Sequence, residues 1–188
     1  MDADLHELSL KNTNKSEIYN QWAKSYNNYV STLDYKGPKQ LIKLLVEYLI
    51  SHDIKYNTIL DFGCGTGLVG IEIYNEPDIN NYTLIGIDIS TKMIEKSNET
   101  STYNHLIIDD ICKYDNINVI KSKLNWNGFD VIVSCGVFLE GHVSLNVIYE
   151  KLVHLINPGG LLAITIRNSY LESNPEFIDK LKSIKFIS

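Results

Sequence analysis

The sequence predicts an α/β protein with a doubly wound, mostly parallel open sheet. Five short runs rich in Ile, Leu and Val alternate with helical segments from Thr58 onward. Each run is too continuously apolar to have a solvated face, which is typical of strands inside a parallel sheet. The glycine-rich stretch GCGTGLVG at 63–70 follows the first run, at the place where doubly wound sheets bind ligands.

The elements of the sheet region follow in order along the chain. The expected strands are TILDF at 58–62, TLIGID at 83–88, HLIID at 105–109, FDVIVSC at 129–135 and LLAITIR at 161–167. The expected helices are one directly after the glycines, one begun by Ser90 or Thr91, one around 116–124 and one over 143–156. Pro158-Gly159-Gly160 is expected to end the last of these and to turn into the fifth strand.

The first 36 residues are expected to form a polar leader and a lid helix, ahead of a main domain over 37–188. The stretch 1–17 is polar and predicts a disordered or weakly ordered leader. The aromatic residues after it recur at intervals of three and four, which places them on one face of a helix. They are Tyr19, Trp22, Tyr26 and Tyr29.

Two more helices are expected outside the alternating region. Gly37-Pro38 breaks the chain, and the apolar stretch LIKLLVEYLI at 41–50 follows as a helix. Asn174, Pro175 and Glu176 carry the start signals of a last helix. Its apolar face would present Phe177, Leu181 and Ile184.

Composition narrows the class of protein. A chain of 188 residues with 44% hydrophobic residues suits one domain, and it has no apolar run long enough to span a bilayer. The net charge of -6 and the scattered Lys and Arg residues argue against a nucleic-acid partner. The start carries acids where a signal or transit peptide would need positive charge.

Cysteine usage points to a reducing compartment. Cys64, Cys112 and Cys135 are odd in number and lack C-x-x-C spacing, so neither a disulfide framework nor a zinc site is expected. We therefore expect a cytoplasmic protein without a metal site and without a membrane partner.

The glycine loop contains two overlapping patterns. Gly65, Gly67 and Gly70 form G-x-G-x-x-G, the phosphate-binding pattern of nicotinamide and flavin enzymes, while Gly63, Gly65 and Gly67 form G-x-G-x-G behind Asp61. A carboxylate about 4 Å from a pyrophosphate charge would cost on the order of 4 kcal/mol, and a cation would gain a similar amount. Asp61 therefore favours a cationic ligand group, such as the ammonium or sulfonium of S-adenosylmethionine.

Acids also end the second and third strands. Asp88 could accept hydrogen bonds from ribose hydroxyls, and this holds for both ligand classes. Asp110 could accept from an adenine amino group, with Asp109 as the alternative after a one-residue shift. The structural alternatives are that Asp88 caps the following helix and that Asp109 or Asp110 merely begins a loop.

Five motifs in order resemble those of class I S-adenosylmethionine-dependent methyltransferases. They are ILDFGCGTG, IGIDIS, HLIIDDI, FDVIVSCG and NPGGLLAIT, and the resemblance covers roughly residues 17 to 180. The chain is more narrowly similar to the methyltransferase-like protein 27 group, also called Williams–Beuren syndrome chromosome region 27. The marks of that similarity are WAKSYNNYV, the turn at 35–38, GCGTGLVG and LEGHV at 139–143.

The resemblance implies a Rossmann-like methyltransferase fold and a set of contacts to S-adenosylmethionine. Asp61, Gly63, Gly65 and Gly67 would line the methionine end, and Asp88 would hold the ribose. Ser134 and Cys135 would lie beside the sulfonium, and Tyr26 or Trp22 of the lid helix would turn towards the cofactor. The adenine contacts would be Ile89, Met93, Asp110 and Ile111. Family members continue into two further strands, so the sheet is expected to lack the last two.

Methyl transfer from a sulfonium is a direct displacement that needs alignment and no metal. Glu140 and His142, after the fourth strand, are the candidate bases, unless Glu140-Gly141-His142 only shapes the loop. The fourth strand is followed by neither N-P-P-Y, D-P-P-Y nor Pro-Cys, so a small-molecule acceptor is expected, with a protein acceptor as the second choice. A non-catalytic cofactor-binding or interaction protein and an NAD(P)-dependent oxidoreductase are the alternative functions.

Overall fold

A five-stranded parallel sheet organises the computed structural model, which describes residues 2–11 and 14–183. The strands are β1 (Thr58–Phe62), β2 (Thr83–Asp88), β3 (His105–Ile108), β4 (Phe129–Phe138) and β5 (Ile156–Ile166). Their order is β3-β2-β1-β4-β5, and every neighbouring pair is parallel. The prediction of a doubly wound parallel sheet is confirmed. The order reverses between β1 and β4, which is where such sheets form ligand sites.

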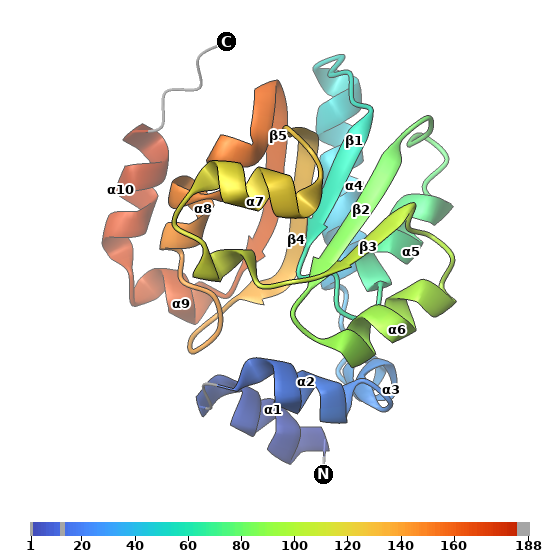
Figure 1. Ribbon diagram of the computed structural model, residues 1–188, viewed down its shortest axis with the longest axis vertical. Coiled ribbons are helices and arrows are strands. Elements are labelled where there is room, and N and C mark those ends of the chain that lie inside the picture. Colours follow the sequence, from blue (N-terminus) through green and yellow to red (C-terminus); the bar gives the residue numbers. More distant parts are fainter. Residues whose placement is uncertain (1, 12–13, 184–188) are drawn as a thin grey trace.

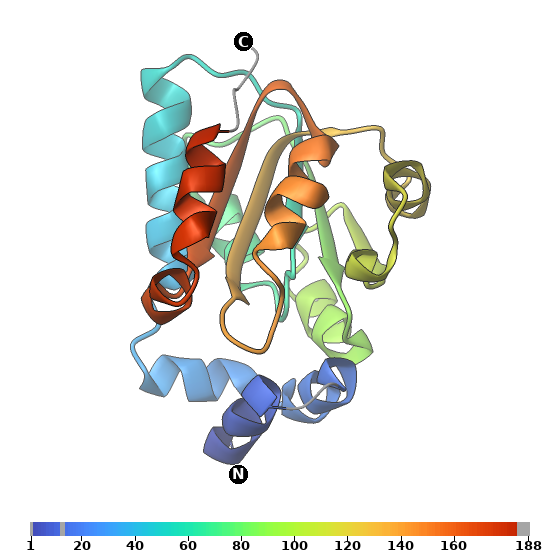
Figure 2. The same cartoon turned by 90° about the vertical axis from the view of Figure 1, so that its left-hand side faces the viewer.

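Helices cover both faces of the sheet (Figures 1 and 2). On one face, α4 (Gly37–Ser51) and α5 (Leu68–Asn75) pack through Ile42, Leu45 and Ile73 against β1 and β2. The other face is covered by α7 (Ile117–Leu124), α8 (Asn146–Glu150) and the 3-10 helix η2 (Leu152–Leu155). Both faces of the strands are thus buried, in agreement with their continuously apolar sequences.

Two helices follow strand ends, and two more come late in the chain. The helix α6 (Thr91–Glu99) begins at Ser90, whose hydroxyl accepts a hydrogen bond from the Met93 N–H, and the 3-10 helix η1 (Ile111–Lys113) follows β3. After β5 come α9 (Asn168–Glu172) and α10 (Pro175–Ser183). Phe177 of α10 packs into the core, as predicted. The Leu181 side chain and Ile184 lie outside the described part of the chain.

Three short helices form a lid below the carboxyl ends of the strands (Figures 1 and 2). The lid consists of α1 (Asp2–Lys11), α2 (Lys15–Trp22) and α3 (Tyr26–Thr32). The expectation of a disordered or weakly ordered leader is wrong for 2–11, because α1 buries Leu5 against Ile18 and Trp22. The expected single aromatic helix is divided between α2 and α3, and its four aromatic side chains still gather in one cluster.

Two further expectations differ from the structure. The helix expected over 143–156 is divided into α8 and η2, with the break at Lys151, whose backbone is not helical. Pro158-Gly159-Gly160 lies within β5, in an irregular segment where Phe129 pairs with Ile156 and Val131 with Leu161. The apolar pattern alone shows neither the break nor the irregular pairing. No described helix is long and apolar enough to cross a membrane.

Candidate active site

A cavity of about 390 Å³ lies at the carboxyl ends of the strands; we call it the strand-end cavity. Loops after β1, β2, β3 and β4 form its walls, and the lid closes one side with Tyr19 and Tyr26. Most of the predicted site residues line it: Tyr26, Gly63, Gly65, Asp88, Ile89, Met93, Asp110, Ile111 and His142. Four predicted residues lie outside its lining: Asp61, Gly67, Ser134 and Glu140.

The glycine loop needs residues without side chains at two positions on the cavity. Gly63 and Gly65 have positive φ angles of 74° and 53°. A Cβ on Gly63 would lie 2.4 Å from Val137 Cγ2, whereas one on Gly65 would meet no atom within 4 Å. Gly65 therefore faces open space, so its backbone can approach a ligand closely. Gly67 is instead the N-cap of α5, and it packs against Ser97 and Thr100 of α6.

Asp61 lies behind the loop and is fully buried. The Tyr103 hydroxyl donates a hydrogen bond to its Oδ2 at 2.6 Å, and its Oδ1 has no partner among the described residues. Burial raises the pKa of Asp61 to about 7; the Tyr103 hydrogen bond opposes this, and the charge of Asp88 adds to it. Tyr103 also accounts for Gly70, because a Cβ there would lie 2.4 Å from the tyrosine ring. Gly70 is thus a packing glycine within α5.

Asp88 joins the loop to the start of α6. Its Oδ2 accepts a hydrogen bond from the Gly65 N–H at 2.9 Å, and its Oδ1 accepts from the Ser90 N–H at 2.8 Å. Burial raises the pKa of Asp88, although these backbone hydrogen bonds oppose the shift. The carboxylate lines the cavity and keeps acceptor lone pairs for a ligand hydroxyl. It therefore has a structural role in the loop together with its predicted binding role.

The two acids after β3, Asp109 and Asp110, differ in their hydrogen-bond and ion-pair partners. Both line the cavity. Asp109 accepts hydrogen bonds from Lys113 at 2.6 Å and from the Tyr114 hydroxyl, which outweigh burial and lower its pKa. Asp110 accepts from the Cys112 N–H through Oδ1 and is also hydrogen-bonded to the Cys112 side chain, and it forms no ion pair within residues 2–11 and 14–183. This geometry favours Asp110 over Asp109 as a ligand contact.

Ser134 and Cys135 are neighbours on β4 but point to different places. The Ser134 side chain is fully buried, and its hydroxyl donates to the Phe62 carbonyl at 2.8 Å. Cys135 lines the cavity, and its Sγ lies 3.2 Å from the Tyr35 hydroxyl. Because successive side chains of a strand alternate between faces, only one of the two can reach the ligand side. The structure places Cys135 there.

Hydrogen bonds from α2 and α3 hold the lid over the cavity. Asn20 Oδ1 accepts from the Ser90 hydroxyl at 2.8 Å, and Ser16 donates to the Ile89 carbonyl at 2.9 Å. From α3, Asn27 accepts from the Thr66 hydroxyl at 2.6 Å. Tyr26 of α3 lines the cavity, and burial raises its pKa to about 12. The neutral Tyr26 hydroxyl is thus available as a hydrogen-bonding group.

His142 belongs to the loop after β4 and contacts the lid through Tyr19. Its Nδ1 contacts the Glu140 carbonyl, which can only accept, so we assign the ring proton to Nδ1. Its Nε2 then accepts from the Tyr19 hydroxyl at 2.8 Å. Burial lowers the pKa of His142 to about 4, and the charges of Lys15 and Arg167 contribute. His142 is therefore neutral at pH 7 and a weak base.

The Glu140 side chain lines neither the strand-end cavity nor the pocket that adjoins it. A hydrogen bond from Ser169 is the main cause that lowers its pKa, and the nearby charge of Arg167 adds to this. A carboxylate with a lowered pKa is a weak general base. Neither of the two predicted bases is therefore tuned to neutral pH in this structure.

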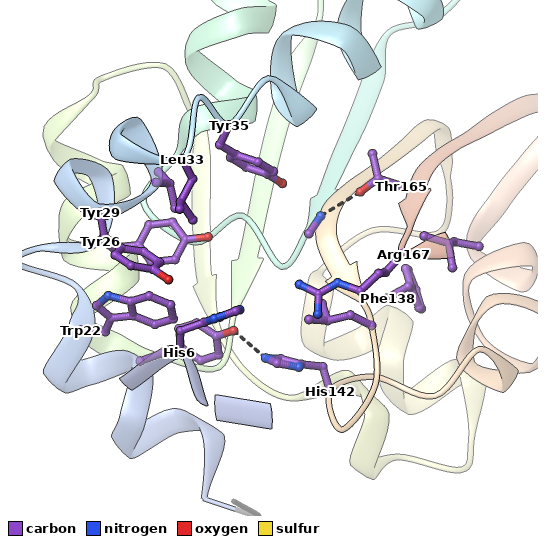
Figure 3. Close-up of a pocket in the computed structure, with 15 residues that line it drawn as sticks. His6, Trp22, Tyr26, Tyr29, Leu33, Tyr35, Phe138, His142, Thr165 and Arg167 are labelled. Carbon is purple, nitrogen blue, oxygen red and sulfur yellow. Dashed lines mark hydrogen bonds between the residues drawn. The ribbon is translucent and has the colours of Figure 1, made fainter. Parts of the chain in front are cut away.

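A second pocket of about 290 Å³ adjoins the first; we call it the aromatic pocket (Figure 3). The lid supplies His6, Trp22, Tyr26 and Tyr29 on one side. Phe138 of β4, Thr165 of β5 and Arg167 form the other side, and Leu33 and Tyr35 lie at the exposed rim. Four residues line both pockets: Tyr19, Tyr26, Gly136 and His142. The two pockets therefore meet beside Tyr26 and Gly136.

Sequence reasoning missed several residues of these pockets. Lys15 and Val137 line the strand-end cavity, and His6 lines the aromatic pocket, yet no local pattern marks any of the three. Arg167 had a signal, because it ends the fifth predicted strand on the edge of the sheet where ligands bind. Applying that rule to all five strands would have included Arg167.

The fold and the site define a doubly wound α/β protein with a ligand cavity at its topological switch point. Residues 55–184 match the model of a family described as a methyltransferase domain, and the chain belongs to this family. The match supports the predicted methyltransferase class over an NAD(P)-dependent oxidoreductase.

Curated relatives narrow the resemblance. The chain is 29% identical to human methyltransferase-like protein 27 over 169 residues, which cover 90% of this chain and 63% of that protein. It is 28% identical over 144 residues to the ribosomal protein L11 methyltransferase of Tolumonas auensis, covering 76% of this chain and 44% of that protein. The predicted resemblance to the methyltransferase-like protein 27 group is confirmed. The chain spans less than two thirds of the length of either relative.

Solved structures share the fold. An S-adenosylmethionine-dependent methyltransferase from Clostridium acetobutylicum ATCC 824 aligns with a TM-score of 0.55 at 20% identity, over 84% of this chain and 61% of that one. The plantazolicin methyltransferase BpumL, solved in complex with a pentazolic desmethylPZN analogue and SAH, aligns with a TM-score of 0.55 at 19% identity. That alignment covers 98% of this chain and 67% of BpumL. At these identities the likeness establishes the common Rossmann-like fold.

Proposed function

We propose that this chain is an S-adenosylmethionine-dependent methyltransferase acting on a small-molecule acceptor. The observation that carries the proposal is the junction of the two pockets at Tyr26, Gly136 and His142. The strand-end cavity would hold the cofactor and the aromatic pocket the acceptor. A nucleophile and a methyl group could then meet at the junction, as a direct displacement requires.

The residues present fit the cofactor. Gly65 leaves room for close backbone approach, Asp88 can accept from ribose hydroxyls, and Asp110 lines the cavity without an ion pair in the described part of the chain. Met93 and Ile111 are buried and supply apolar surface for an adenine ring. When bound, S-adenosylmethionine supplies a methyl group already activated by a positively charged sulfur.

Asp61 would act on the cofactor through the loop. Its side chain does not line the cavity, so the predicted direct contact is not the geometry seen in the structure. Its buried, unpartnered Oδ1 nevertheless makes a cation on the far side of the loop favourable. A bound ammonium group would stabilise the ionised carboxylate, so cofactor binding and deprotonation of Asp61 should support each other.

The lid residues would orient the acceptor and exclude water. Tyr19 donates to His142, so this pair forms a fixed neutral wall at the junction, while the Tyr26 hydroxyl remains available to an acceptor. His142 would serve mainly to position Tyr19, because its lowered pKa makes it a weak base. Alignment would then contribute more to the reaction than proton removal.

The size of the aromatic pocket supports a small acceptor. Its volume of about 290 Å³ lies at the lower end of ligand pockets, which span roughly 300–1,000 Å³. One or two rings would fill it, whereas a protein acceptor would have to insert a single side chain. We also infer a reducing compartment such as the cytoplasm, because Cys64, Cys112 and Cys135 are free thiols. The expectation of no nucleic-acid partner stays a prediction from charge.

Calorimetric titration tests the cofactor. We expect S-adenosylmethionine and S-adenosylhomocysteine to bind and NAD to give no heat. Tight NAD binding without a response to the other two would contradict the proposal. The second candidate function is a non-catalytic cofactor-binding protein, which the weak basicity of both His142 and Glu140 favours. Transfer of a labelled methyl group to any acceptor would exclude this alternative.

A further inference from the structure

The aromatic pocket carries positive charge and no carboxylate. Arg167 follows β5 and points across the pocket towards the lid (Figure 3). His6 and His142 are the only other ionisable nitrogen side chains in its lining, and no Asp or Glu lines it. Glu140, whose pKa the charge of Arg167 helps to lower, is hydrogen-bonded to Ser169 and lies outside the lining.

The guanidinium of Arg167 has no fixed partner. Within residues 2–11 and 14–183, no side chain or carbonyl forms a hydrogen bond or an ion pair with it, and the residue is exposed. The positive charge of Arg167 affects both histidines. Burial is the main cause that lowers the pKa of His6 and of His142, and the charge of Arg167 lowers each of them further. A free guanidinium in a concave site is suited to bidentate recognition of a carboxylate or phosphate.

The rest of the lining is aromatic. Trp22 lies 5.0 Å from Tyr26 and 5.3 Å from Tyr29 between ring centroids, and the His6 ring lies 5.9 Å from that of Trp22. The exposed rim residues are also apolar or aromatic, with Leu33 59% and Tyr35 39% exposed. Such walls favour a flat, apolar ring system, which stacks or packs edge to face on them.

A cluster of aromatic rings could also bind a cation. The distribution of charge around the aromatic pocket decides whether a cationic or an anionic ligand is favoured. Cation recognition by aromatic rings relies on their negative faces and is strongest where no positive charge competes. Here Arg167 faces the same space, and the lining contains no carboxylate to offset it. The acids of the site, Asp88, Asp109 and Asp110, all line the strand-end cavity instead.

We propose that the aromatic pocket binds an aromatic acid, with its anionic group at Arg167 and its ring against the lid residues His6, Trp22, Tyr26 and Tyr29. The inference rests on the proposed function for its role as the acceptor site. The ring would place its far end at the junction beside Tyr26 and Gly136, where the two pockets meet. The methyl-accepting atom would therefore lie on the side of the ring opposite the acid group.

Sets of compounds that share one ring and differ in charge test whether the aromatic pocket prefers an acid. The probes are benzoate, 2-naphthoate and indole-3-acetate, each compared with its neutral amide and with the amine of the same ring. Binding to the full chain is measured by ligand-observed NMR and calorimetry at millimolar concentrations. We expect at least one acid to bind about tenfold more tightly than its amide, the scale of a hydrogen-bonded charge pair, and the amines to bind most weakly.

Variants of Arg167 test whether this residue causes the difference in affinity between acid and amide. Arg167→Gln should remove the difference between acid and amide, and Arg167→Lys should keep part of it because the charge remains while the planar fork is lost. Lys123→Gln, an exposed lysine on α7, is the matched control and should leave the difference unchanged. Because Arg167 is exposed, its variants should melt at the same temperature as the parent.

Different results of these titrations would contradict the aromatic-acid site and the proposed methyltransferase function. Equal binding of acid and amide, tighter binding of the amines, no binding by any probe, or an acid preference that survives Arg167→Gln would each overturn the inference. The same titrations carried out with and without S-adenosylhomocysteine test the proposed function separately. An acid preference in a chain that binds no S-adenosylhomocysteine would support the aromatic-acid site and reject the methyltransferase assignment.

Discussion

The strand-end cavity and the aromatic pocket share four residues and are built in different ways. Most of the cavity wall comes from loops that directly follow strands of the main sheet. The aromatic pocket forms where the lid, from the first 36 residues, meets the ends of β4 and β5 more than 100 residues later. Two large clusters of buried residues lie on the faces of the sheet, whereas the hydrophobic cluster of the lid has three buried members among the described residues: Leu5, Ile18 and Trp22.

This difference predicts unequal stability of the two pockets. Segments with few buried apolar contacts open locally at a lower free energy than the main core. The strand-end cavity should therefore persist when the lid opens, while the aromatic pocket should be lost. Such an arrangement would let the proposed acceptor enter and leave without unfolding the sheet. The following predictions test it, beginning with the largest expected effect.

Trp22→Ala should separate the two regions most clearly. Trp22 is 2% exposed and forms the centre of the lid core, so truncation should cost about 3–5 kcal/mol of local stability. Hydrogen exchange should show protection lost in α1–α3 and retained in β1, β2 and β4. Leu33→Ala, at a 59% exposed position, is the control and should change little. Loss of protection throughout the sheet would show that lid and sheet unfold together.

Asp61→Asn should change the pH dependence of the sheet region. The pKa of Asp61 is about 7 in the folded chain and 3.8 ordinarily, so the folded state binds more protons between these values. The free energy of unfolding should then fall by about 4 kcal/mol as pH rises from 4 to 8, and the asparagine variant should lack this fall.

Urea denaturation at pH 5, 6, 7 and 8 measures the effect of Asp61→Asn. The variant should be the more stable protein at pH 8, with the advantage shrinking towards pH 5. It should also bind S-adenosylhomocysteine more weakly, because the charge behind the loop is gone. Parallel stability curves for the parent and the variant would reject the raised pKa.

Asp88→Ala should weaken the strand-end cavity while leaving the aromatic pocket intact. The variant loses the acceptor of the Gly65 and Ser90 N–H groups together with the proposed ribose contact. We expect the affinity for S-adenosylhomocysteine to fall on the order of 100-fold by calorimetry. Asp115→Ala, an exposed acid after β3, is the matched control. Unchanged affinity in Asp88→Ala would show that the ribose assignment is wrong.

His142→Asn should produce a smaller effect with the opposite pH dependence to Asp61→Asn. Burial lowers the pKa of His142 from 6.5 to about 4, so the unfolded chain binds more protons between these values. Stability contributed by the neutral imidazole should be present above pH 6.5 and lost as pH falls towards 4. The parent should therefore lose more stability than the variant across this range, mainly in the lid through Tyr19. His154→Asn, at an exposed position, should retain the slope of the parent.

Most of the strand-end cavity could be predicted from sequence because the motifs that form it lie within short stretches of chain. Strand, glycine loop and helix follow one another directly over residues 58–75, and parallel strands bring Asp88 and Asp110 to the same edge of the sheet as Gly65. The side-chain directions could not be predicted. Asp61 turns behind the loop because Tyr103, 42 residues later, donates to it, and Ser134 turns to the Phe62 carbonyl.

The aromatic pocket could be predicted less well from local sequence patterns. Tyr26 was expected from the aromatic spacing and from the resemblance, but His6 lay in a segment expected to be disordered. The segment forms α1 because Leu5 packs against Ile18 and Trp22, which no pattern within α1 alone indicates. Glu140 and His142 were expected together, and the structure places only His142 in the pockets.

The sequence by itself determined the alternation of strands and helices from Thr58 onward, the glycine loop, the acids at the strand ends and the methyltransferase class. These depend on hydrophobic periodicity, turn residues and the edge at which parallel strands end, all of which act over short stretches of chain. Only the tertiary structure decided which side chains face the ligand, how His142 is paired and that Arg167 meets the lid aromatics. Those depend on contacts between residues 40 to 160 positions apart, whose free energies exist only once the chain has folded.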